Sequence, residues 1–193
     1  MPTVDFGTYH HTTPKQSKEI RNWAQKETSK LLPSLYSPDS NLRILDAGCG
    51  LGFLASVAAK CFSNANIIGV DLFGHESMSD LSIDRAVKNV KALGIDSRVS
   101  FLEHDLTKPL KPRPKYDLVL SNLVFHNMGK QRFEAYGTVL GALKKKGYFV
   151  IGDLFPPSKA DMDYLLRCST LVSEIGGIRA GRWVYGIKVL RKK

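Results

Sequence analysis

The sequence has few cysteines, no long hydrophobic run and fewer acidic than basic residues, and each shortage excludes a class of protein. The three cysteines, Cys49, Cys61 and Cys168, are odd in number and far apart, which disfavours a disulfide framework or a cysteine metal site. No apolar stretch approaches membrane-spanning length, and the first residues lack the basic start and apolar middle of a secretory signal. We therefore expect a cytoplasmic protein with reduced thiols, no metal and no membrane partner.

The residues that are present suffice for one folded domain. The chain has 193 residues, of which 43% are hydrophobic and 24% charged, so it is long enough for one mid-sized core and too short for two. We expect a single domain over residues 1–193, with an N-terminal segment and helix in residues 1–38 and the core in residues 39–193.

Hydrophobic periodicity predicts alternating helices and strands. Residues 15–32 carry apolar side chains at intervals of three and four, which indicates an amphipathic helix that Pro33 ends. Strands are then expected at 42–48, 64–73, 98–106, 116–125 and 147–155, and helices at 53–62, 77–94, 130–143 and 158–170.

The last two extended segments, 171–181 and 182–193, are joined too tightly for a helical crossover and should pair antiparallel. The alternation before them is typical of right-handed parallel crossovers. The predicted fold is therefore α/β: a seven-stranded, mostly parallel, doubly wound, Rossmann-like sheet with an antiparallel C-terminal hairpin and helices on both faces.

Three glycines at every second position stand in the stretch ILDAGCGLGF, where the first core strand turns into a helix. Glycine permits dihedral angles and a close backbone approach that a side chain would block. Helix N-termini also attract anionic groups. A plain tight turn remains the alternative interpretation of Gly48, Gly50 and Gly52 when they are considered alone.

Two nucleotide-binding motifs are excluded by the spacing of these glycines. A dinucleotide fingerprint requires its third glycine where Phe53 stands, and a P-loop requires a lysine followed by serine or threonine. The remaining pattern is acidic-x-G-x-G-x-G, which begins at Asp46.

With this pattern, the chain resembles the class I S-adenosylmethionine-dependent methyltransferases, in the style of small single-domain members, and the likeness runs in order through residues 40–193. The resemblance implies that the glycine loop wraps the amino-acid end of the cofactor. It also implies that Asp71 accepts from the ribose hydroxyls, that Asp105 accepts from the adenine amino group and that Leu106 packs on the ring. The full set of implied cofactor positions is Tyr9, Asp46, Gly48, Cys49, Gly50, Gly52, Asp71, Leu72, Asp105, Leu106, Ser121 and Asn122.

The segment after the fourth core strand reads SNLVFHNM, in place of the N-P-P-Y or D-P-P-Y of enzymes that methylate exocyclic amines. Methylation of DNA adenine is therefore disfavoured. Methyl transfer from a sulfonium depends mainly on positioning, and a general base matters for acceptors that must lose a proton. His126 and Asp153 are the candidate catalytic residues because both follow strands at the ligand-binding edge. A packed loop histidine and a loop or helix-capping carboxylate are the alternatives.

The acceptor is expected near the N-terminal segment and the terminal hairpin. The resemblance suggests that Tyr9, His10 and His11 close the pocket as a lid, and a segment ordered only when a ligand binds is equally compatible. The candidate substrate residues are His10, His11, His126, Arg179 and Arg182.

The formal net charge of +10 permits an acidic partner. Two basic runs, in residues 108–115 and 144–146, precede strands, and the C-terminal tail follows the last one, so much of this charge is expected at the edge opposite the chemistry. The favoured function is methyl transfer from S-adenosylmethionine to a small molecule, which leaves S-adenosylhomocysteine. An RNA or protein methyltransferase and a non-catalytic cofactor-binding subunit are the alternatives.

Overall fold

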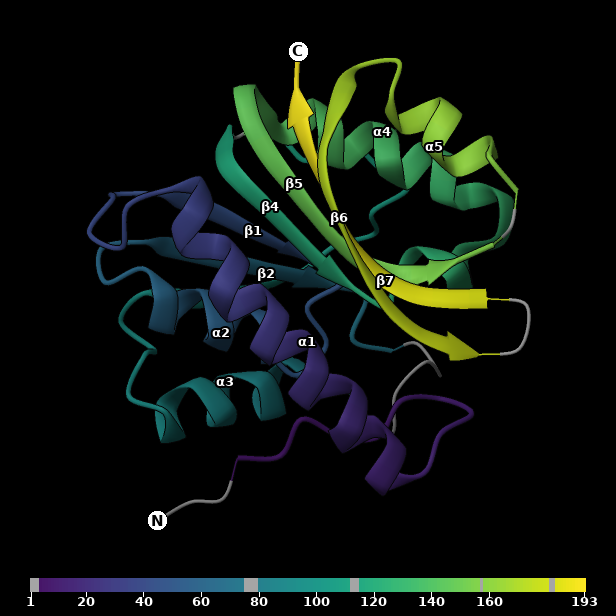
Figure 1. The fold of residues 1–193 in the computed structure, drawn as a ribbon. Coiled ribbons are helices and arrows are strands. Elements are labelled where there is room, and N and C mark those ends of the chain that lie inside the picture. The colour runs from purple at the N-terminus through teal and green to yellow at the C-terminus, as the bar shows by residue number, and fades with distance from the viewer. Residues whose placement is uncertain (1–3, 75–79, 112–114, 157, 181–182) are drawn as a thin grey trace.

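The computed structural model describes residues 4–74, 80–111, 115–156, 158–180 and 183–193, and the side chains of residues 179, 180 and 183 also lie outside this description. The described residues form one seven-stranded sheet in the order β3-β2-β1-β4-β5-β7-β6 (Figure 1). The strands are β1 (Arg43–Ala47), β2 (Asn66–Asp71), β3 (Val99–Glu103), β4 (Tyr116–Asn122), β5 (Leu143–Phe155), β6 (Ser169–Ala180) and β7 (Trp183–Lys192).

Strands β1 to β5 pair in parallel, whereas β7 pairs antiparallel with both β5 and β6. The predicted fold class is therefore confirmed. Strand order reverses between β1 and β4, and ligands of open α/β sheets bind at the carboxyl ends of strands at such a reversal. This topology directs attention to the ends of β1 and β4.

Helices cover both faces of the sheet. They are α1 (Pro14–Leu35), α2 (Phe53–Cys61), α3 (Ile83–Ala92), the 3-10 helix η1 (Phe125–Gln131), α4 (Arg132–Ala142) and α5 (Ala160–Leu165). Helices α1, α2 and α3 contribute to the core on one face, and α4 and α5 to the core on the other (Figure 1). Central strands β1 and β4 are buried almost throughout, as expected for parallel strands covered on both faces.

The first helix begins where local chemistry stabilises its N-terminus. Thr13 and Gln16 form a reciprocal capping box, and Pro14 occupies the first turn, where its missing N–H is harmless. Pro33 does not end α1 as predicted, because it lies inside the last turn and the helix continues to Leu35. A proline this close to the end of a helix removes one backbone hydrogen bond without interrupting the turns before it.

Three other predicted boundaries are wrong. The described α3 begins only at Ile83, after the Ser82 cap, and α5 ends at Leu165 because Ser169 already starts β6. Strand β5 begins at Leu143, so the lysines of residues 144–146 lie within it and do not precede it. Both strands extend because pairing with a neighbouring strand satisfies backbone groups that the local sequence does not report.

No helix among the described residues has both the length and the hydropathy required to cross a bilayer. The cytoplasmic location stays a prediction.

Candidate functional site

The glycine loop after β1 adopts backbone conformations that favour glycine. Gly48, Gly50 and Gly52 have φ angles of 73°, 52° and 84°. A Cβ on Gly48 would lie 2.3 Å from a methyl group of Val124, and one on Gly52 would lie 2.9 Å from the ring of Phe101. Both left-handed dihedrals and close neighbours therefore require glycine here. The plain-turn interpretation does not account for Gly50, because Gly50 lines a cavity.

Asp46, at the carboxyl end of β1, is a buried carboxylate with one oxygen left over. Its Oδ2 accepts from the backbone N–H of Ala55 at 2.8 Å, whereas Oδ1 has no hydrogen-bond partner among the described residues. Burial raises the pKa of Asp46 to about 7, a backbone hydrogen bond from Ala55 opposes the rise, and the Asp71 carboxylate adds to it. An unpartnered buried oxygen is costly, so this atom indicates that a donor arrives with a ligand.

Asp71, at the end of β2, connects the glycine loop to the cavity. Its Oδ2 accepts from the N–H of Gly50 at 2.9 Å, and its Oδ1 accepts from the N–H of Phe73 at 3.3 Å. Leu72 follows it and also lines the cavity, with 46% of its surface exposed. A large exposed apolar side chain beside a carboxylate is suited to a ligand with a ring and hydroxyl groups.

Asp105 and Leu106, just beyond β3, form the next part of the wall. Asp105 Oδ1 accepts from both the N–H and the hydroxyl of Thr107, at 2.8 and 2.7 Å. These hydrogen bonds lower the pKa of Asp105 and keep it ionised. Strand pairing thus places Asp46, Asp71 and Asp105 side by side at one edge of the sheet.

The cavity between these strand ends has a volume of about 270 Å³. Its walls are Tyr9, Gly48, Gly50, Asp71, Leu72, Leu81, His104, Asp105, Leu106, Thr107, Asn122, Leu123, Val124, Asn127, Met128 and Gln131. Sequence reasoning missed most of the wall after β4, namely Leu123, Val124, Met128 and Gln131. The structure marks this wall by the backbone of Leu123, whose φ is 59°. Non-glycine residues with such strained dihedral angles are found most often at functional sites.

The N-terminal segment reaches the cavity through Tyr9, which is one of its lining residues. Its hydroxyl lies 3.2 Å from Asn122 Nδ2, and Asn122 Oδ1 lies 2.6 Å from the hydroxyl of Tyr185 on β7. The backbone N–H of Tyr9 donates to the hydroxyl of Ser17, which attaches the segment to α1. Asp5, four residues before Tyr9, contacts Asn89 and Arg85 of α3. The N-terminal segment is therefore hydrogen-bonded to both α1 and α3, and its role as a lid stays a prediction.

His126 and Asp153 form a pair, but not in this cavity. His126 Nδ1 and Asp153 Oδ1 are 2.5 Å apart, and because a carboxylate can only accept, the ring proton belongs on Nδ1. Both residues line a separate hollow of about 230 Å³. Helix η1 divides the two spaces: Asn127 and Met128 face the cavity, whereas His126 and Gly129 face the hollow.

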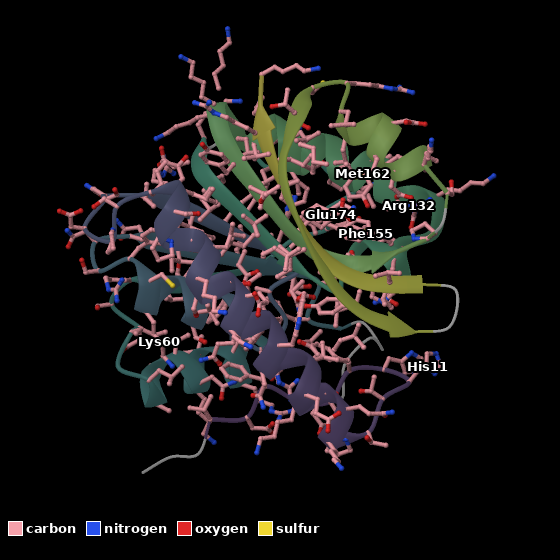
Figure 2. The ribbon with its side chains drawn as sticks, viewed as in Figure 1. His11, Lys60, Arg132, Phe155, Met162 and Glu174 are labelled. Carbon is pink, nitrogen blue, oxygen red and sulfur yellow. The ribbon has the colours of Figure 1, made fainter. Side chains whose placement is uncertain are left out.

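The carboxylates that line this hollow are hydrogen-bonded to groups of the protein itself. Asp153 also accepts from the N–H groups of Phe125 and Leu154, at 2.8 and 2.7 Å. Beside it, Asp161 pairs with Arg132 at 2.5 Å and accepts from Tyr136. Figure 2 shows Arg132 and Phe155 near the α4–α5 side of the sheet, well apart from His11 in the loop before α1.

The remaining predicted site residues, Asp46 and Gly52 among them, do not line the cavity. Ser121 is buried and donates to the Ala47 carbonyl at 2.8 Å, which ties β4 to β1. Cys49 is buried against Gly69, and burial raises the pKa of its thiol well above the ordinary value. His10 and His11 are exposed, with ring centres 3.7 Å apart.

The predicted arginines at the hairpin fall outside the description. Arg182 lies beyond the described residues, and for Arg179 only its backbone pairing with Val184 is described. Their part in acceptor binding stays a prediction.

The comparison with known families decides how this cavity should be interpreted. Residues 38–175 match the methyltransferase domain family. The chain belongs to the class I S-adenosylmethionine-dependent methyltransferases. The match covers the strands that carry Asp46, Asp71, Asp105 and Asn122.

Relatives of this methyltransferase differ in what they act on. A malonyl-[acyl-carrier protein] O-methyltransferase of Halalkalibacterium halodurans is 31% identical over 121 residues, which are 61% of this chain and 41% of that protein. A ribosomal protein L11 methyltransferase of Desulfotalea psychrophila is 26% identical over 164 residues, which are 83% of this chain and 45% of that protein. The chain thus matches less than half the length of either.

A solved structure supports the fold over nearly the full length. The magnesium protoporphyrin IX methyltransferase of Synechocystis, crystallised with S-adenosylhomocysteine, has a TM-score of 0.72 at 15% identity, covering 97% of this chain and 91% of that one. At this identity the likeness concerns the fold alone.

The cavity of this methyltransferase fits the family's cofactor chemically. S-adenosylmethionine carries a sulfonium and an ammonium group, and three carboxylates stand at this edge of the sheet. Asp46, whose buried Oδ1 has no hydrogen-bond partner among the described residues, lies next to the glycine loop but outside the lining. Gly48 and Gly50 expose backbone to the cavity, and Leu72 and Leu106 offer apolar contact for a purine.

Proposed function

We propose that this protein transfers the methyl group of S-adenosylmethionine to a small-molecule acceptor. The observation that carries the proposal is the cavity, whose lining combines the glycine loop with the carboxylates that end β2 and β3. The unpartnered oxygen of Asp46 beneath this loop supports the same interpretation.

Each part of the lining then has a task. Asp71 receives the ribose hydroxyls and, by accepting from Gly50, keeps the loop in the shape that admits the amino-acid end. Asp105, held by Thr107, receives the adenine amino group, while Leu72 and Leu106 pack on the ring. When bound, S-adenosylmethionine supplies an electrophilic methyl group. The protein contributes orientation and exclusion of water.

The N-terminal segment favours a small acceptor. Tyr9 lines the cavity and its segment is hydrogen-bonded to α1 and α3, so a polymer that needed this space would have to displace the segment. We propose that residues 1–38, which include this segment, serve as lid and helix to the core of residues 39–193. An acceptor presented by a partner, as the name of the malonyl-[acyl-carrier protein] relative describes for that protein, remains within this proposal.

The basic residues at the opposite edge have structural partners. Lys144 pairs with Asp117 at 2.7 Å, and Lys115 donates to the Gly141 carbonyl at 2.7 Å. Lys192 donates to the carbonyls of Leu140 and Leu143, at 2.6 and 2.8 Å. Cations near the C-terminal end of α4 stabilise its carbonyls, which accounts for part of the net charge without a nucleic acid.

For His126 and Asp153, we propose a positioning role. Asp153 holds the start of η1 through the N–H of Phe125 and through His126, and η1 carries Asn127 and Met128 to the cavity wall. His126→Ala should then change the affinity for the acceptor and the turnover together, whereas a catalytic base would show mainly as lost turnover with an altered pH profile.

One experiment tests the proposed function. Purified protein is incubated with methyl-labelled S-adenosylmethionine and a cell extract, and the label is followed through a low-mass filter, ribonuclease and protease. We expect the label in the low-mass fraction. Label sensitive to ribonuclease or protease would overturn the small-molecule acceptor. Binding of S-adenosylhomocysteine without transfer to any fraction would indicate a non-catalytic subunit.

A further inference from the structure

The hydrogen-bond chain at the lid end of the cavity has a defined direction. The Tyr185 hydroxyl lies 2.6 Å from Asn122 Oδ1, a length typical of O–H···O bonds and short for N–H···O bonds. The 3.2 Å contact between Asn122 Nδ2 and the Tyr9 hydroxyl has the length of an N–H···O bond. Tyr185 therefore donates to Asn122, and Asn122 donates to Tyr9.

This direction makes the Tyr9 hydroxyl a donor toward the cavity. Its oxygen already accepts from Asn122, and the Arg21 guanidinium, 5.1 Å from the ring centre, also interacts with it. Among the described residues, no acceptor receives the proton of Tyr9. Burial raises the pKa of the Tyr9 phenol, and the charge and hydrogen bond of Arg21 offset only part of the rise. Tyr9 is thus a neutral donor and a poor base.

No described group at this end of the cavity is suited to remove a proton from an acceptor. His126 and Asp153 face the other side of η1, and His10 and His11 are exposed outside the lining. His104 belongs to the lining, but it lies beside Asp105 at the end of β3 and contacts the carbonyl of Lys108. An acceptor that is already deprotonated when it binds needs no such base.

The first helix adds positive potential next to Tyr9. Helix N-termini usually carry acidic residues, which the helix dipole stabilises, yet the first turn of α1 has none. Lys15 lies in this first turn, and Lys18, Glu19 and Arg21 follow in the next turn. Basic residues where the dipole opposes them indicate that a negative group approaches.

We propose that the acceptor is a carboxylate, which binds the Tyr9 hydroxyl beside Arg21 and leaves as a methyl ester. This inference rests on the proposed function and narrows its substrate class. One carboxylate oxygen attacks the methyl carbon, the C–O bond forms as the C–S bond breaks, and the electron pair remains on sulfur. No proton moves, so no base is required.

The chemistry of the labelled product tests this inference directly. Methyl esters release methanol in mild alkali, whereas methyl groups on nitrogen, carbon or ether oxygen are retained. Protein is incubated with methyl-labelled S-adenosylmethionine and cell extract, and the product is treated with alkali and assayed for volatile label. We expect most of the label as methanol. Label that survives alkali overturns the carboxylate but leaves the methyltransferase, whereas no label at all counts against the proposed function.

Three variants test the named residues. Tyr9→Phe removes only the hydroxyl and should lower volatile label at limiting extract about tenfold, the size of a hydrogen bond to a charged group. Arg21→Met should lower it at least as much, and Arg21→Lys should recover part of the loss. Lys26→Met, at an exposed position further along α1, is the control and should stay within twofold.

Calorimetry with S-adenosylhomocysteine separates the acceptor from the cofactor. Both Tyr9→Phe and Arg21→Met should bind it within about threefold of the unchanged protein, because their proposed partner is the acceptor. A tenfold loss of this affinity in both variants would mean that they hold the carboxylate of the cofactor, and the inference would fail.

Discussion

The sheet edge at the ends of β1, β2 and β3 and the hollow between β5, η1 and α5 both carry carboxylates, but the hydrogen-bond partners of these carboxylates differ. At the sheet edge, buried Asp46, outside the cavity lining, has an oxygen with no partner among the described residues, and Asp71 accepts from the N–H of Gly50 at 2.9 Å. In the hollow, Asp153 and Asp161 accept from backbone, imidazole, guanidinium and phenol groups. A carboxylate oxygen without a hydrogen-bond partner indicates a site for a ligand, whereas a fully hydrogen-bonded carboxylate holds parts of the protein together.

The largest effect is expected from Asp71→Ala, which removes a carboxylate from the cavity. The variant loses the acceptor for Gly50 N–H and for the ligand hydroxyls. Charge-assisted hydrogen bonds contribute about 1.5–3 kcal/mol each, so affinity for S-adenosylhomocysteine should fall roughly 100-fold or more. Calorimetry measures this, with the exposed Asp96→Ala as control. Equal affinity of both variants would remove Asp71 from the site.

Asp161→Asn tests the other side of the comparison. It leaves the guanidinium of Arg132 without its ionic partner in the hollow. Breaking a buried pair costs about 3 kcal/mol, which corresponds to a melting temperature lower by roughly 6–12 °C for a domain of this size. Affinity for S-adenosylhomocysteine should stay within twofold. Asp163→Asn, exposed on the same helix, is the control, and a selective loss of ligand affinity with unchanged stability would contradict the assignment.

Asp46→Asn should trade affinity for stability. Because burial raises the pKa of Asp46 from 3.8 to about 7, its contribution to stability falls as pH rises through this interval. At pH 8 the variant should therefore have a free energy of unfolding higher by about 1–2 kcal/mol and a higher melting temperature. The gain is limited because the new amide still lacks one hydrogen-bond partner. Its affinity for S-adenosylhomocysteine should fall at least tenfold. A less stable variant at pH 8 would refute the buried-charge argument.

The smallest effect is the pH dependence of cofactor binding. A cationic ligand favours ionised Asp46, so affinity for S-adenosylmethionine should rise with pH. With a pKa of about 7, the ionised fraction grows from about a tenth at pH 6 to about nine tenths at pH 8, a gain of up to roughly ninefold. Calorimetry in two buffers of different ionisation enthalpy should detect proton release near pH 6.5. The slope should vanish in Asp46→Asn.

Sequence patterns predicted the strands and the glycine loop because period and glycine spacing are local properties. They also brought Asp71, Leu72, Asp105 and Leu106 to the cavity, since the carboxyl ends of parallel strands meet at one edge. The same logic failed to separate His126 from the cavity. His126 follows a strand at the correct edge, but η1 directs His126 and Gly129 to the hollow and Asn127 and Met128 to the cavity. A short 3-10 helix has no reliable sequence signal.

The sequence by itself determined the alternation of elements, the position of the glycine turn and the acids that follow β1, β2 and β3. These depend on backbone preferences and on hydrophobic period, which each segment carries within itself. Tertiary structure alone decided which buried carboxylate remained unsatisfied and which found partners. Hydrogen-bond satisfaction depends on groups distant in the chain: Tyr185 on β7 orients Asn122 on β4, which in turn orients Tyr9 before α1.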